Sequence, residues 1–371
     1  MGNKKVFIIT SILSILAIVI GFLLGGGYYL LKNAPQSEKL SFGDFNIHVM
    51  ELGNQYTGDC IYIKSGDTDI LIDAGSRTNS AGAIIEYVDQ YVTDGKLEYV
   101  IATHADRDHI SAFNGTSSQV GVLEYYDIDM IIDFPLTNST TNTYKTYREN
   151  VEKKVASGTI HYTALECYNE ENGAQRVYQI SEGVEMEILY NYYYDHSSSD
   201  ENNYSVCLIF NQGDSHYLFT GDLEAEGEEH LLEYYSGENS LPQCVFYKGA
   251  HHGSRTSNTK ELLSVIQPEY VVVCCCAGTP EYTDTPANQF PTQEFIDNIA
   301  PYTDKVYIPT VVDTITTSES GSQSYTVKSL NGDIVLSFSQ GVAKVTCSVS
   351  DLVLKDSDWF KENRTLPAEW Q

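Results

Sequence analysis

The hydrophobic positions of the chain form one long run at the start and many short runs after it. Residues 6–31, VFIITSILSILAIVIGFLLGGGYYLL, carry no charged side chain. A helix of this length crosses a bilayer, and the run is too long for the core of a typical signal peptide. Lys4 and Lys5 precede it, so the positive-inside rule places the N-terminus in the cytoplasm, although Lys32 weakens this bias. We expect an uncleaved single-pass membrane anchor with the remaining chain outside the cell; cleavage after residues 25–27 is the alternative.

Beyond a polar linker at residues 32–39, short apolar runs bounded by Gly and Asp turns predict strands. The strands are expected at 45–52, 60–66, 68–75, 99–104, 129–134, 184–190, 205–210, 216–222, 243–249 and 269–276. Helices are expected between them, at 80–92, 143–156, 224–235 and 258–266. This order predicts two mixed sheets covered outside by helices, an αββα sandwich of the α/β class. It fits neither a parallel doubly wound sheet nor an all-β barrel.

The same pattern divides the chain into three parts. Residues 1–36 are predicted to form a cytoplasmic stub, the anchor and a linker, and residues 37–318 to form the main domain. Residues 324–349 contain three further apolar runs around an Asn-Gly-Asp turn, which is typical of a small antiparallel meander. We therefore expect residues 319–371 to form a small β meander and a C-terminal tail, packed on the main domain.

Net charge limits what the protein binds. With 22 Lys and Arg residues against 51 Asp and Glu residues, the formal net charge is −29, spread over the chain. A solvated surface that keeps an exported protein soluble explains this excess. A sequence-independent nucleic-acid binder needs a basic surface. DNA therefore fits as a substrate only if metal ions carry much of the phosphate recognition.

The eight cysteines do not predict disulfides, although the main domain is expected outside the cell. Most of them lie in the apolar runs, at Cys60, Cys207, Cys244 and residues 274–276. A thiol in such a run acts as a small core hydrophobe, and the spacing lacks the paired CxxC form of a zinc knuckle. We expect these cysteines to be structural.

Four polar clusters each follow a predicted strand. They are DAG at Asp73, THADRDH at residues 103–109, TGD at Asp222, and GAHHGS at His251 and His252. Loops at strand ends commonly carry active sites, and histidine and carboxylate side chains bind borderline divalent metals. A lone Asp there is more often a turn former, and a lone His is more often structural. The four clusters together favour one shared metal-binding site.

The order of these clusters resembles that of the metallo-β-lactamase superfamily. More narrowly, the chain is similar to the exported hydrolase domain of ComEC-type competence proteins and their stand-alone relatives in the segments THADRDH, ENNYSVCLIFNQGDSHYLFTGDLE and KGAHHGSRTS. The resemblance covers about residues 42–309, with residues 125–182 poorly matched. It implies that residues 37–318 are a metallo-β-lactamase-like hydrolase domain.

The resemblance also implies two divalent metal ions, Zn²⁺ or Mn²⁺. His104, Asp106 and a group from a later loop would bind the first ion. Asp108, His109 and a late histidine would bind the second ion, and Asp222 would bridge the two.

The late histidine is one of an adjacent pair. In a strand-like segment His251 and His252 would point in opposite directions, so we expect only one of them to bind metal. Both remain candidates at this point. His252 is alternatively expected to face the substrate as an acid or a hydrogen-bond donor.

Two ligand positions depart from the family pattern. Asp106 replaces the common second histidine, as in the ComEC-type group, and its carboxylate favours Mn²⁺ beside Zn²⁺. The usual histidine before the bridging aspartate is absent, and Asn202 or Asn203 would offer a neutral amide oxygen instead. His196 is the other candidate for this role. Phe290 stands where relatives often carry a histidine, so a helper proton donor is expected to be missing.

The chemistry that the resemblance implies is metal-assisted hydrolysis by a metal-bridging hydroxide, without a side-chain nucleophile. The residues expected to take part in it are Asp108, Asp222, His252 and Lys248. Lys248 is expected to pair either with a substrate phosphate or with a neighbouring carboxylate. Asp73 is expected to orient a ligand or close the turn rather than bind metal.

The leading hypothesis is therefore a membrane-anchored, extracytoplasmic, metal-dependent phosphodiesterase that acts on DNA or on a cell-envelope phosphoester. The ComEC resemblance favours DNA, and the net charge of −29 disfavours it. A lactone or other acyl-bond hydrolase is one alternative, because the same metal pair serves both reactions. A catalytically inactive binding or sensory relative is another, motivated by the asparagine replacement. No stable protein partner is inferred.

Overall fold

The computed structural model describes residues 45–317, 323–339 and 342–371. The expected anchor at residues 6–31 lies outside these ranges and stays a prediction. Among the described residues, no helix combines the length and the apolar character that crossing a bilayer requires.

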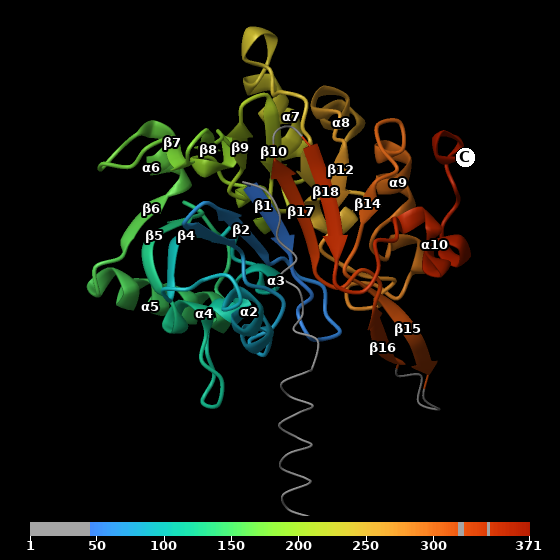
Figure 1. The fold of residues 1–371 in the computed structure, drawn as a ribbon, viewed down its shortest axis with the longest axis horizontal. Coiled ribbons are helices and arrows are strands. Elements are labelled where there is room, and N and C mark those ends of the chain that lie inside the picture. The colour runs from blue at the N-terminus through green and yellow to red at the C-terminus, as the bar shows by residue number, and fades with distance from the viewer. Residues whose placement is uncertain (1–44, 318–322, 340–341) are drawn as a thin grey trace, which may run out of the picture. The chain divides into compact units, whose positions relative to one another are not determined.

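Two large β-sheets form the centre of the described chain (Figure 1). The first has eight strands in the order β18, β17, β1, β2, β3, β4, β5 and β6. Their bounds are β1 Phe45–Val49, β2 Ile61–Ser65, β3 Thr68–Ile72, β4 Lys96–Ile101, β5 Asp127–Asp133, β6 Ile160–Thr163, β17 Ile334–Ser339 and β18 Val342–Cys347. Strands β3 to β6 run parallel, and the other neighbours are antiparallel. The sheet is therefore mixed.

The second large sheet has seven strands in the order β14, β12, β11, β10, β9, β8 and β7. Their bounds are β7 Val177–Ser181, β8 Val184–Ile188, β9 Leu208–Gln212, β10 Ser215–Phe219, β11 Phe246–Lys248, β12 Tyr270–Val272 and β14 Val306–Tyr307. This sheet is mixed as well, since β10, β11, β12 and β14 run parallel and the rest are antiparallel. A third, three-stranded sheet contains β13 Cys276–Ala277, β15 Thr310–Thr317 and β16 Gln323–Ser329.

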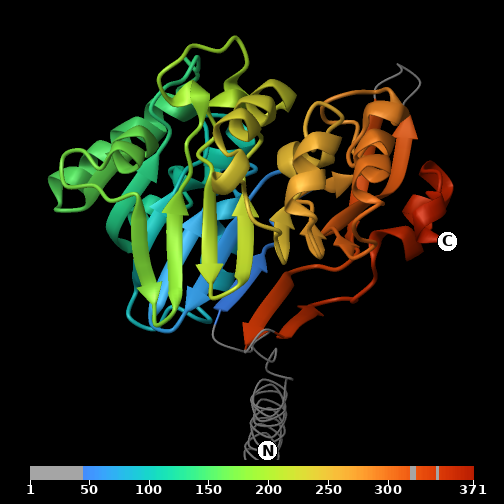
Figure 2. The same cartoon turned by 90° about the horizontal axis from the view of Figure 1, so that it is seen from above.

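The two large sheets face each other, and helices cover their outer sides (Figure 2). Phe45 of β1 packs against Phe210 of β9 and Tyr217 of β10, with ring centroids 5.4 and 4.6 Å apart. The helices are α2 Ser80–Val88, α3 Arg107–Ile110, α4 Val122–Tyr125, α5 Asn142–Ala156, α6 Ala164–Asn169, α7 Ala225–Tyr234, α8 Lys260–Ile266, α9 Gln293–Ile299 and α10 Asp358–Asn363. Buried side chains of α7, α8 and α9 form a second core on the far side of the seven-stranded sheet. The predicted αββα sandwich is confirmed.

The meander expected at residues 324–349 is wrong in its pairing, because its strands divide between two sheets. β16 pairs with β15, whereas β17 pairs with β1 and β18. The Asn-Gly-Asp turn therefore connects two sheets instead of closing a hairpin. The physical reason is burial: Phe338 of β17 packs against Tyr217, with ring centroids 4.5 Å apart, so β17 completes the core between the large sheets.

Three loops at strand ends lock together where the polar clusters lie. The Asp59 amide donates to the Asp108 carbonyl at 3.0 Å, and the Gly75 amide donates to the Asp59 carbonyl at 2.8 Å. Position 75 leaves no room for a side chain, because a Cβ atom there would lie 1.6 Å from the Asp108 carbonyl oxygen. The backbone of these loops thereby fixes the position of Asp108.

We expect Gly75→Ala to lower the free energy of unfolding by about 3 kcal/mol, because the added Cβ must displace the Asp108 backbone. Gly82→Ala in α2 is the control, since the nearest atom to a Cβ there belongs to the flexible Gln119 side chain, 3.3 Å away. An alanine in place of a helical glycine is neutral or stabilises by about 1 kcal/mol. Urea denaturation measures both variants. Wild-type stability of Gly75→Ala would show that these loops are not locked together.

Candidate metal centre

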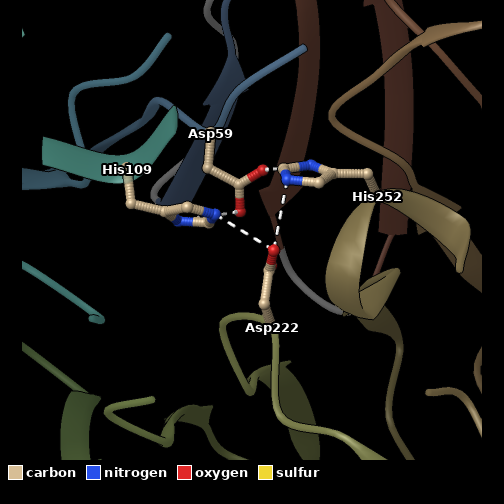
Figure 3. Close-up of side chains that lie close together, drawn as sticks. All are labelled: Asp59, His109, Asp222 and His252. Carbon is tan, nitrogen blue, oxygen red and sulfur yellow. Dashed lines mark hydrogen bonds and ion pairs between the residues drawn. The ribbon is translucent and has the colours of Figure 1, made fainter. Parts of the chain in front are cut away.

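Four buried side chains from four separate segments of the chain converge on one point (Figure 3). Asp59, His109, Asp222 and His252 each offer one ligand atom, and these atoms all lie within 4.8 Å of one another. Asp59 precedes β2, His109 belongs to α3, Asp222 follows β10, and His252 lies in a short 3-10 segment after β11. None of the four is more than 1% exposed. Imidazole and carboxylate ligands in this combination suit Zn²⁺ and Mn²⁺.

Asp222 lies between the two imidazole rings. Its Oδ2 atom is 3.1 Å from His109 Nε2 and 3.1 Å from His252 Nε2. His252 Nε2 is also 3.2 Å from Asp108 Oδ2. The structure therefore brings Asp108, His109 and Asp222 together with one of the two late histidines.

The charges in this cluster compensate one another. Burial lowers the pKa of His109 and His252, but the carboxylates, Asp222 first, raise both pKa values above that of an ordinary histidine. Burial likewise raises the pKa of Asp222, but His109, His252 and Lys248 outweigh it and hold this pKa well below its usual range. Buried carboxylates need a cation beside them. A divalent metal ion meets the same requirement, with the histidines as neutral ligands.

Asp73 orients His109. Its Oδ1 atom accepts a hydrogen bond from the Thr103 amide at 2.8 Å, and its Oδ2 atom lies 2.8 Å from His109 Nδ1. With Nδ1 donating to this carboxylate, Nε2 is the nitrogen left to face Asp222. Asp73 thus takes the orienting position expected from the sequence.

The adjacent histidines separate, and His252 is the one in the cluster. Both have left-handed backbone angles, with φ of 45° at His251 and 54° at His252, so they lie in a tight turn and not in the expected strand-like segment. His252 Nδ1 donates to the Cys274 carbonyl at 2.8 Å, which leaves Nε2 facing Asp108. His251 is half-buried, and its Nδ1 atom lies 3.1 Å from Glu224 Oε1. His251 is therefore not one of the four clustered side chains.

His104 and Asp106 form a second group next to the cluster. The His104 ring is buried, with its centroid 4.1 Å from that of His109. Burial holds the pKa of His104 well below the ordinary value, so the ring is neutral. Its Nε2 atom has no hydrogen-bond partner among the described residues, and Asp106 Oδ2 lies 3.8 Å away. An unpartnered, buried, neutral imidazole nitrogen suits a first metal ion at this position.

The expected replacements for the missing histidine make other contacts. The Asn202 side chain donates to Glu224 Oε1 at 3.2 Å, and Asn203 Oδ1 accepts from the Glu224 amide at 3.3 Å. His196 is exposed and stacks on Tyr192, with ring centroids 3.8 Å apart. Within the described ranges no contact joins Asn202 or His196 to the clustered side chains, so their expected roles as ligands gain no support.

Lys248 is a partner of carboxylates. Its ammonium group donates to Asp59 Oδ2, to Asp222 Oδ1 at 2.7 Å and to the Gly221 carbonyl at 2.7 Å. Burial lowers the pKa of Lys248, but Asp222 and Asp59 outweigh it and hold this pKa above the ordinary value. Because Lys248 is only 1% exposed, it does not reach a substrate phosphate and instead positions the two aspartates.

Two residues of the centre were missed in the sequence. Asp59 had one signal, a Gly-Asp pair directly before an apolar strand, which resembles an ordinary turn. Tyr282 had none, since it lies in an irregular loop. Its hydroxyl donates to Asp108 Oδ2, at the opening of the centre.

Comparison with known proteins agrees with these motifs. Residues 53–128 match the family model described as Metallo-beta-lactamase superfamily. Among solved structures, the metallo-beta-lactamase fold protein YhfI from Bacillus subtilis covers 76% of this chain and is itself covered to 99%, at 10% identity and a TM-score of 0.39.

Curated relatives are proteins of competence and recombination. Competence protein ComA of Neisseria gonorrhoeae is 33% identical over 119 residues, which are 32% of this chain and 16% of that protein. ComE operon protein 3 of Bacillus subtilis is 22% identical over 181 residues, 48% of this chain and 20% of that protein. Recombination protein 2 of Haemophilus influenzae is 22% identical over 244 residues, 64% of this chain and 25% of that protein. The chain thus spans a quarter or less of each relative's length.

These matches confirm the resemblance seen in the motifs. The chain carries a metallo-beta-lactamase superfamily segment at residues 53–128 and is similar, over part of its length, to competence proteins.

Proposed function

We propose that the protein is a metal-dependent hydrolase that cleaves phosphodiesters. The convergence of Asp59, His109, Asp222 and His252, whose ligand atoms lie within 4.8 Å of one another, carries this proposal. The superfamily match over residues 53–128 supports metal-dependent hydrolysis in general. A phosphodiester is the substrate class that the competence relatives favour.

We propose two divalent ions. One would be held by the cluster of Asp59, His109, Asp222 and His252, with Asp108 beside it. His104 and Asp106 are the candidates to hold the other. Such ions supply Lewis acidity and neutralise negative charge that develops during hydrolysis. The protein's own contribution is orientation: Asp73 holds His109, and the Cys274 carbonyl holds His252. Lys248 holds Asp222 through the Oδ1 atom and leaves Oδ2 between the imidazoles.

The substrate is DNA or a cell-envelope phosphoester, and the site lies outside the cell on a single-pass anchor. The apolar run at residues 6–31 supports the anchor. An inactive binding relative is a second candidate, favoured by one observation: among the described residues, Asn202 makes no contact that completes the position at His104 and Asp106.

Asp108→Ala and Asp222→Ala are each expected to lower hydrolysis of bis(4-nitrophenyl) phosphate by at least about 1,000-fold. Each variant removes a carboxylate that contacts His252 at the proposed metal site. His196→Ala is the matched control and should keep wild-type turnover, since His196 is exposed and stacks on Tyr192. The assay is run with added Mn²⁺ or Zn²⁺ and again after chelation, which should abolish wild-type activity. Unchanged turnover in both aspartate variants would refute the assignment of the site.

Lys248→Met leaves Asp59 and Asp222 buried without their ammonium partner, so the metal-free protein should lose about 3 kcal/mol of stability. Bound Mn²⁺ or Zn²⁺ supplies positive charge at the same carboxylates. The difference in melting temperature between variant and wild type should therefore shrink when metal is added. Lys305→Met, which removes a half-exposed pair with Glu269, should cost about 1 kcal/mol or less and show no metal dependence. If added metal leaves the stability difference between Lys248→Met and the wild type unchanged, this result would argue against a cation site here.

A further inference from the structure

A cavity of about 440 Å³ adjoins the candidate metal centre, and some of its lining side chains have no part in holding the ions. The polar side chains that line it are Asp106, Arg107, Asp108, Thr141, Thr143 and Tyr282. Asp108 forms the shared wall, because its Oδ2 atom contacts His252 Nε2 at 3.2 Å and also accepts a hydrogen bond from the Tyr282 hydroxyl. A molecule in this cavity would therefore lie directly beside the metal centre.

Arg107 brings a free positive charge to this cavity. Its side chain is 56% exposed, and within the described part of the chain its one ionic contact is with Glu281 Oε1 at 3.7 Å, beyond hydrogen-bond distance. Arg77 makes a much closer pair with the same oxygen atom. The guanidinium donors of Arg107 thus remain available to a ligand. This is notable in a chain with a net charge of −29.

Tyr282 lines the same cavity, where its hydroxyl donates its one proton to Asp108 Oδ2. The preceding residue, Glu281, is held by Arg77 and by the Thr57 amide, which donates to Oε2 at 3.0 Å. Phe290, with its ring centroid 5.6 Å from that of Tyr282, offers no polar group here. Tyr282 therefore helps to fix Asp108 at the wall of the cavity.

We propose that Arg107 binds a phosphate group of the substrate in this cavity and is the specificity-determining charge, while Tyr282 positions Asp108 beside it. A guanidinium group binds phosphate oxygens through two parallel hydrogen bonds. Asp106 and Asp108 line the same cavity and repel an anion until divalent ions neutralise them, so the site binds phosphate only in the metal-loaded protein. A neutral lactone would gain nothing from this charge. The inference rests on the proposed function for the identity of the substrate as a phosphodiester.

The test is isothermal titration of inorganic phosphate into the full-length, Mn²⁺-loaded protein. Arg107→Gln should weaken phosphate binding at least tenfold, with its Mn²⁺ content unchanged. Lys153→Gln is the charge-matched control and should bind as the wild type does, because Lys153 lies exposed about 18 Å along α5 from Thr141. Wild-type affinity in Arg107→Gln, or no phosphate binding by the loaded wild type, would overturn the inference.

Turnover separates this inference from the proposed function. Arg107→Gln should raise KM for bis(4-nitrophenyl) phosphate about tenfold and leave hydrolysis of the neutral ester 4-nitrophenyl acetate unchanged. If the loaded wild type binds phosphate through Arg107 but cleaves no phosphodiester, the proposed function fails and the phosphate site stands. If Arg107→Gln changes cleavage of both esters alike, the phosphate site fails and the hydrolase stands.

Discussion

The buried carboxylates of Asp59, Asp108 and Asp222 need cations beside them, and the rest of the centre follows from that need. Carboxylates removed from water are costly unless positive charge and hydrogen bonds surround them. Lys248 supplies one permanent charge, and His109 and His252 supply two imidazoles. Together these groups meet the requirement with ligand atoms that also suit a metal ion.

The fold places these groups by bringing strand ends together. Asp59 lies just before a strand, Asp222 and His252 lie shortly after one, and His109 lies in the helix that follows β4. The two sheets pack through large aromatic side chains such as Phe45 and Tyr217. Gly75 allows the loops before β2 and after β4 to touch through their backbones. Rigid sheets and close loops are what allow an orienting residue such as Asp73 to fix one nitrogen of His109. The geometry of the site therefore depends on the packing between the sheets.

Much of this was predictable from the sequence, because apolar runs and polar clusters are local patterns. The sandwich and the Asp73, Asp108, His109 and Asp222 positions followed from such patterns, and the six cysteines expected to be structural are buried. Pairing partners were not predictable: β17 joins β1 across almost the whole described chain, and the choice depends on the core that Phe338 completes. The difference between His251 and His252 depends on left-handed backbone angles, which no local pattern revealed. The roles proposed for Tyr282 and Arg107 depend on the cavity that both residues line.

The most direct test of the cation site is anomalous X-ray diffraction from crystals of the Mn²⁺-loaded protein, measured at the manganese absorption edge. A metal centre built on Asp222 predicts an anomalous peak about 2.2 Å from Asp222 Oδ2, within ligand distance of His109 or His252 Nε2. No peak at Asp222, or manganese bound only at surface carboxylates, would contradict it.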